Sequence, residues 1–167
     1  MAGTSESLPA LLGALTADRL AILARHEASA RVVAHYDFNN TYQYVISREE
    51  THLRWLLDAL TDVGASVPAP ASSLGEPVAP KGTDAAAFQE ILSADATSLG
   101  GFVDRWQPRV AAMTHARHRR MLDVILDESR EHQRLFAQAA TGFEDVLGRR
   151  TKGSPRIGGV LPKRWQA

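Results

Sequence analysis

The chain has 167 residues, enough for one domain with a substantial core. Nineteen basic residues balance nineteen acidic ones, so the overall charge gives no reason to expect binding to nucleic acid or to a membrane surface. The absence of cysteine excludes disulfides, thiolate zinc sites and cysteine-bound iron–sulfur clusters. The apolar run at residues 8–15 is too short and too interrupted for a signal or membrane segment, so we expect a cytoplasmic protein.

The first two predicted elements are helices separated by a turn. Residues 1–15 are expected to form an N-terminal lead-in, and residues 16–63 then follow a helical pattern without glycine or proline. The pair Asn39-Asn40 favours a turn over a helix interior. We therefore expect a break there and a second helix over about residues 41–62. Without the break, the two helices would fuse into one rod, and each site would need two chains.

Residues 64–83 contain four prolines and cannot be helical. An extended segment of this length can run from one end of a helical bundle to the other. We expect such a crossover between the second and third helices. A linker without fixed structure between two helical hairpins is the alternative.

The third predicted helix starts at Asp84, and the fourth continues to about Leu147. The turn between them has two possible positions. Pro108 is typical of the first turn of a helix, whereas Thr114 is an equally good N-cap residue. Residues 148–167 are rich in arginine, lysine, glycine and proline and are predicted to form a basic C-terminal tail.

The predicted inward face of each helix carries one acid near its middle, and two of these faces add a histidine. The residues concerned are Glu27, Glu49, His52, Asp95, Glu128 and His132. Four unpaired buried carboxylates would cost more than the ~5–15 kcal/mol by which a domain is typically stable. Two divalent cations would neutralise all four and use both imidazoles. Carboxylate and imidazole ligands suit iron or manganese.

Simpler explanations exist for each of these residues. Protonation or a buried arginine could compensate a carboxylate, and Glu27 could form a surface ion pair with Arg31. The polar faces of the second and fourth helices could turn toward solvent, and Asp95 could be a surface residue. If the fourth helix starts at Pro108, Glu90 would replace Asp95 as the candidate on the third helix.

With these residues, the chain resembles the ferritin-like di-iron superfamily, which includes rubrerythrins and bacterioferritins. That pattern has Glu on the first helix, Glu-x-x-His on the second, an acid on the third and Glu-x-x-His on the fourth. The resemblance implies an all-α, antiparallel four-helix bundle over residues 16–147 with a long crossover between helices 2 and 3. The chain departs from the pattern where Glu128 and His132 are one residue further apart, where Asp95 replaces Glu, and in its short first hairpin.

The resemblance also implies a function. Members of the superfamily bind two iron ions, with manganese possible, and react with dioxygen or peroxide. We therefore expect a ferroxidase or peroxidase-like oxidoreductase that takes electrons from an external donor, and a homodimer is the expected assembly. The alternative is a metal-free helical interaction module that docks a partner through its basic tail. Neither reading includes nucleic acid or a membrane as a partner.

Overall fold

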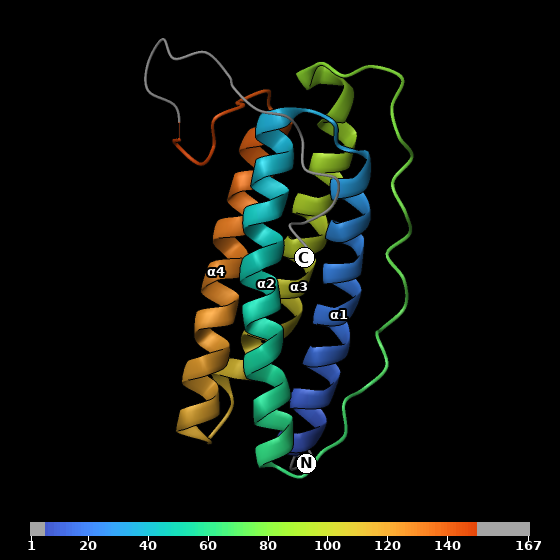
Figure 1. Cartoon of the computed structure of the whole chain (residues 1–167). Coiled ribbons are helices and arrows are strands. Elements are labelled where there is room, and N and C mark those ends of the chain that lie inside the picture. Colours follow the sequence, from blue (N-terminus) through green and yellow to red (C-terminus); the bar gives the residue numbers. More distant parts are fainter. Residues whose placement is uncertain (1–5, 150–167) are drawn as a thin grey trace.

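The computed structural model describes residues 6–149, and within this range the protein is helical with no strand. A short 3₁₀ helix, η1, precedes the third of four α-helices (Figure 1). The elements are α1 (Leu8–Val32), α2 (Tyr36–Asp62), η1 (Ala85–Phe88), α3 (Gln89–Ala111) and α4 (Ala116–Ala140). The prediction of an all-α protein with four helices is confirmed. Helix α1 packs mainly on α2, and α3 mainly on α4.

Helix α1 begins at Leu8, eight residues before the predicted start. The Ser7 hydroxyl caps the helix by accepting from the amide of Ala10, and a proline occupies the first turn. Leu12 and Leu15 are fully buried. The prediction of an N-terminal lead-in over residues 1–15 was therefore wrong for residues 8–15, whose leucines join the core.

The break between the first two helices lies at residues 33–35, slightly before the predicted position. Asn39 lies within the first turn of α2. Its Nδ2 atom donates to the carbonyl oxygens of Ala30 at 2.9 Å and Val33 at 3.2 Å. These are among the last carbonyls of α1, which have no partner within the helix. Asn39, at the start of α2, thus caps the C-terminal end of α1.

Residues 63–84 contain no helix and follow the outer side of α1 in Figure 1. Gly64 has φ +68°, a left-handed conformation that ends α2. Two hydrogen bonds attach the segment to α1. The amide of Ala71 donates to the carbonyl of Ala17 at 2.9 Å, and Arg25 Nη1 donates to the carbonyl of Gly75 at 3.2 Å.

The pair formed by the third and fourth helices begins near the predicted start at residue 84, and the fourth helix ends before its predicted end. Asp84, the predicted first residue of the third helix, is the N-cap of η1 and accepts from the amide of Ala87. Of the two candidate starts of the fourth helix, Pro108 lies inside α3 and Thr114 lies in the turn at residues 112–115, whereas His115 caps α4. Because α3 passes through Pro108, Asp95 keeps its inward position and Glu90 is exposed.

Helix α4 ends at Ala140, seven residues before the predicted end at Leu147. Gly142 then adopts φ +97°, which allows the chain to leave the helix. Phe143, which the predicted fourth helix included, lies after α4 and is 55% exposed. Most of the predicted basic tail, residues 150–167, lies outside the described residues.

The core between the four helices is continuous and mostly aliphatic and aromatic. Among residues 6–149, no helix combines the length and apolarity needed to cross a membrane. The core also encloses a large set of polar side chains at mid-height. This polar set is the candidate functional site.

Candidate functional site

The inward faces of α2 and α3 are those that the sequence predicted. Glu49 and His52 on α2 and Asp95 on α3 are all 0% exposed. The inward face of α1 differs from the prediction by one position. Glu27 is half-buried, and the neighbouring His26 is fully buried instead. Arg19 lies seven residues before His26, on the same face of α1, and its side chain is also fully buried in the core.

The guanidinium group of Arg19 lies between three helices. Its Nη1 atom donates to Oε1 of Glu49 on α2 at 3.0 Å, and its Nη2 atom donates to the Ser129 hydroxyl on α4 at 2.6 Å. The group lies 4.3 Å from the ring centroid of Phe102 on α3. Burial lowers the pKa of Arg19, while Glu49 opposes that effect. The bundle therefore holds a fixed positive charge at its centre.

The Glu49 carboxylate also binds His26. The distance from Nδ1 of His26 to Oε2 of Glu49 is 2.9 Å. Burial acts to raise the pKa of Glu49, but His26, Arg19 and His132 together outweigh burial and lower it to about 2. Glu49 is therefore ionised at neutral pH, and its charge is compensated by groups of the protein itself.

The imidazole of His52 is oriented by Glu128. Its Nε2 atom lies 2.7 Å from Oε2 of Glu128, and Arg48 holds the same carboxylate at 3.0 and 2.7 Å. Burial lowers the pKa of His52 to about 4, so the ring is neutral at pH 7. The hydrogen bond to a carboxylate assigns the single proton to Nε2. Nδ1 then carries a lone pair, and this buried atom has no hydrogen-bond partner among the described residues.

His132 lies beside His52 in a similar environment. The two rings are nearly parallel, with 6.2 Å between their centroids. Burial lowers the pKa of His132 to about 4, and the Glu49 carboxylate only partly opposes this. Its Nδ1 atom is also buried without a partner among residues 6–149. Two neutral imidazoles thus lie side by side, and each has a buried Nδ1 atom without a hydrogen-bond partner among the described residues.

On α4, Ser129 is fully buried, whereas the Glu128 side chain is 30% exposed. Ser129 is the residue three positions before His132, where the ferritin-like pattern places Glu. Glu128 reaches the site from its edge and contacts His52 through the ring nitrogen opposite Nδ1. The extra residue in this motif therefore turns the carboxylate away from the centre of the bundle.

Asp95 belongs to a second buried network, on the α1 side of α3. It accepts from Arg25 at 2.8 Å, from Ser29 at 2.7 Å and from the hydroxyl of Tyr42. Burial and the Asp95 charge raise the pKa of Tyr42 well above its usual value, so the phenol stays protonated and donates. All oxygens of Asp95 are thus bound by protein donors.

Of the six predicted ligands, the structure brings four near one another: Glu49, His52, Glu128 and His132. Glu27 lies outside this group, and Asp95 is bound by the second network. A two-iron centre of the ferritin-like kind needs a carboxylate from each helix. Here Glu49 is the fully buried carboxylate beside the imidazoles, and Arg19 and Ser129 occupy inward positions on α1 and α4. The six-ligand site stays a prediction.

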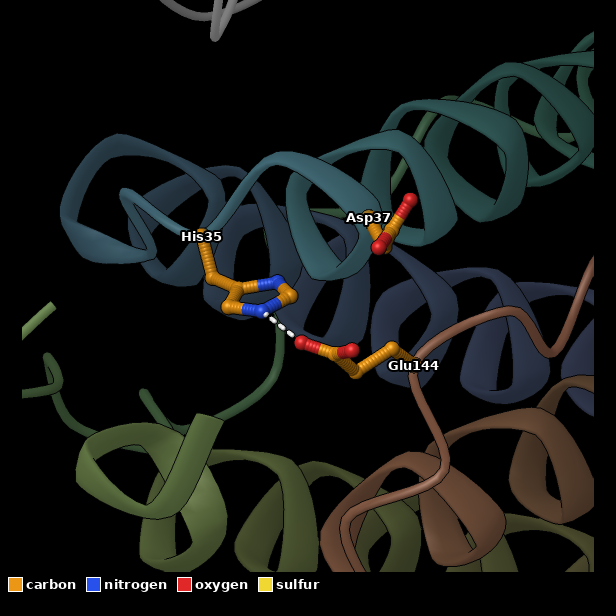
Figure 2. Close-up of side chains that lie close together, drawn as sticks. All are labelled: His35, Asp37 and Glu144. Atoms are coloured by element: carbon orange, nitrogen blue, oxygen red, sulfur yellow. Dashed lines mark hydrogen bonds and ion pairs between the residues drawn. The ribbon is translucent and has the colours of Figure 1, made fainter. Parts of the chain in front are cut away.

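Among residues 6–149, a different trio is the only group of three potential ligands whose ligand atoms all lie within 4.8 Å of one another. His35 and Asp37 at the start of α2 lie near Glu144 from the segment after α4, with ligand atoms within 4.8 Å of one another (Figure 2). His35 Nε2 is 2.6 Å from Glu144 Oε1, while its Nδ1 accepts from the amide of Phe38 at 3.4 Å. Both ring nitrogens are therefore engaged within the protein. We interpret the trio as a contact that fastens residue 144 to α2.

Sequence reasoning missed Arg19, His26 and Ser129. The signal for α1 was present, because the leucines at 8, 11, 12 and 15 continue at three- and four-residue spacing to positions 19, 22, 23 and 26. Taking residues 8–15 as a lead-in removed that series and shifted the predicted face by one residue. For Ser129, the Glu-x-x-His spacing counted back from His132 indicates the inward position.

No family model matches the chain, and no curated protein and no solved structure does so either. The ferritin-like resemblance therefore depends on the helical layout and on the residues described above.

Proposed function

We propose that this protein is a ferritin-like metal-binding bundle that holds one divalent metal ion between His52 and His132 and acts as an oxidoreductase on dioxygen or peroxide. Iron is the expected metal, with manganese as the alternative. The proposal includes the antiparallel arrangement of the helices and the crossover formed by residues 64–83. The short turns at residues 33–35 and 112–115 and the two hydrogen bonds between the crossover and α1 support that arrangement.

The observation that carries the proposal is the pair of unpartnered Nδ1 atoms. Buried polar atoms normally have a hydrogen-bond partner, and each exception asks for an explanation such as an ion or a water molecule. An imidazole that donates from one nitrogen to a carboxylate and presents the other nitrogen as a lone pair has the arrangement of a metal ligand and its supporting residue. His52 with Glu128 has this arrangement.

The charges at the site favour one ion. Both imidazoles are neutral at pH 7, because burial lowers each pKa to about 4, so neither repels a cation. Glu49 and Glu128 act on both imidazoles with negative charge, and Arg19 acts on both with a positive charge, so two carboxylates face one guanidinium at this point. A bound iron or manganese ion would supply electrons to the oxidant. The residues of the chain would hold it in a site shielded from bulk water.

Metal analysis tests the proposal. The protein is produced in medium supplemented with iron or with manganese, and its metal content is measured by mass spectrometry. We expect about one ion per chain in the wild type and a large loss in His52→Gln and His132→Gln. The matched control is His115→Gln, an exposed histidine at the start of α4. A metal-free wild type, or equal metal content in all four proteins, would contradict the proposal.

A second candidate is the metal-free interaction module, and one observation favours it. The Arg19–Glu49 pair already neutralises the central carboxylate with protein groups alone. In that case, water molecules would satisfy the two Nδ1 atoms, and the basic tail would bind a partner. The tail lies largely outside the described residues. A metal-free wild type in the experiment above would favour this candidate.

Under the main proposal, dioxygen or peroxide is the oxidant, an external protein or small molecule is the electron donor, and a homodimer is the expected assembly. These remain predictions. Reduction of the loaded protein followed by addition of either oxidant, monitored by visible absorption, identifies the oxidant that reacts.

A further inference from the structure

Arg19 is a fully buried cation at the centre of a helical bundle. Arginine is almost never fully buried unless its charge is paired. Its position is fixed from several sides, by Glu49 at 3.0 Å, by Ser129 at 2.6 Å and by the ring of Phe102 at 4.3 Å. Residues from three other helices thus form a slot for one guanidinium group.

The side chains around the slot suit a guanidinium and leave little charge for a second metal ion. Ser129 is short and neutral, so it accepts a hydrogen bond without adding negative charge. Phe102 offers the face of its ring to the cation. Among residues 6–149, Glu49 is the one carboxylate that forms an ion pair with the guanidinium, and the two charges form a neutral pair. A metal ion placed next to Arg19 would be repelled by it and would compete with it for Glu49.

From these contacts we infer that Arg19 takes the place of a second metal ion, so that the centre is limited to one ion and carries its other positive charge on the protein. The inference rests on the proposed function only for the statement that the wild-type centre binds one ion. It assigns Arg19 as the residue that sets the metal stoichiometry, acting with Ser129.

Removal of the cation is the first test. In Arg19→Met, Glu49 keeps its buried charge and loses one of its two hydrogen-bond partners, so a divalent ion should substitute for the guanidinium. We expect Mn²⁺ or Co²⁺ to raise the melting temperature of Arg19→Met by about 5–10 °C more than that of the wild type. If Arg19→Met is insoluble without metal, soluble yield that recovers in metal-supplemented medium supports the inference, and insolubility in both media overturns it.

The matched control is Arg25→Met. Arg25 also pairs with a fully buried carboxylate, that of Asp95 at 2.8 Å, but it belongs to the second network. Its loss should lower the melting temperature without the additional rise on metal addition. Equal metal-induced shifts in Arg19→Met and Arg25→Met would overturn the inference, because the effect would then be general to any unpaired buried acid.

The second test converts the slot into a metal site. The variant Arg19→Glu/Ser129→Glu replaces the cation by a carboxylate and adds another on α4. We expect one more bound Co²⁺ or Fe²⁺ per chain than in the wild type, measured by equilibrium dialysis and by the visible bands of Co²⁺. An unchanged stoichiometry would contradict the inference.

The two proposals fail in distinguishable ways. A wild type with no metal and a double variant with one or more ions would contradict the proposed function and support the role of Arg19. A wild type and a double variant with one ion each would support the function and contradict the role of Arg19. Absence of metal in both would contradict both.

Discussion

Arg19 donates to Oε1 of Glu49 across 3.0 Å, and both side chains are fully buried. The residues come from α1 and α2, which are consecutive helices, so the ion pair links these two helices at a defined position. The cost of moving two charges out of water makes such a pair a weak source of net stability. The loss of one partner is far more costly than the loss of both, because the remaining charge stays buried.

This asymmetry predicts a strong coupling between the two positions. We expect Glu49→Leu alone to lower the free energy of unfolding by about 3–5 kcal/mol, since Arg19 would remain buried and unpaired. The double variant Arg19→Met/Glu49→Leu should be clearly more stable than Glu49→Leu. Urea unfolding of the wild type, the single variants and the double variant measures the coupling. Additive effects would show that the pair does not act as a unit.

The Asp95 network predicts a graded series of effects. Tyr42→Phe keeps the buried ring and removes one of three donors to Asp95, so we expect a loss of about 1–2 kcal/mol. Asp95→Ala leaves Arg25, Ser29 and Tyr42 without their acceptor and should cost more than Tyr42→Phe. Chemical unfolding of both variants tests the order. A larger loss in Tyr42→Phe would show that the ring packing of residue 42 is disturbed as well.

The sequence was sufficient to predict the four helices and the inward faces of α2 and α3. On those helices, the apolar residues recur every three or four positions on both sides of the acid, so the face is defined from two directions. Glu49, His52 and Asp95 were placed inside for this reason, and they are fully buried. The non-helical segment at residues 64–83 was predicted from its prolines alone.

The partners of those residues were not predictable in the same way. Arg19 and Ser129 have no metal-ligand chemistry, so a search for acids and histidines passes over them. Their role appears only when the helices are packed and Arg19 from α1 meets Glu49 and Ser129 from two other helices. Periodicity alone also does not say whether a buried carboxylate is compensated by a metal ion or by an arginine. That choice depends on contacts between distant parts of the chain.

The connection between α1 and α2 gives a further prediction. Asn39→Ala removes two hydrogen bonds to the last carbonyls of α1 and should lower the free energy of unfolding by about 1–2 kcal/mol. Asn40→Ala is the matched control, because the neighbouring residue is only half-buried and should change stability by less than about 0.5 kcal/mol. Thermal unfolding of both variants separates a specific cap from a general preference for asparagine in this turn.

The stability of the protein should fall as the pH is lowered below about 6.5. Burial lowers the pKa of His52 and His132 from 6.5 to about 4, so the unfolded chain binds protons in this range that the folded protein does not. By linkage, stability falls between pH 6.5 and pH 4, by about 2 kcal/mol per imidazole from pH 7 to pH 5. Glu49 has its pKa lowered from 4.5 to about 2, so its contribution is complete above pH 4.5 and is lost below that value.

Urea unfolding at pH 7 and pH 5, in the presence of a chelator, measures the contribution of the imidazoles. His52→Gln and His132→Gln should each lose less stability between these two pH values than the wild type, because the substituted side chain does not titrate. Asn40→Ala, which replaces a half-buried residue that does not titrate, should follow the wild type. The same pH dependence in the wild type and in the two core variants would mean that the imidazoles already exchange protons freely in the folded state. In that case, the neutral, metal-ready form proposed for them at pH 7 would need to be abandoned.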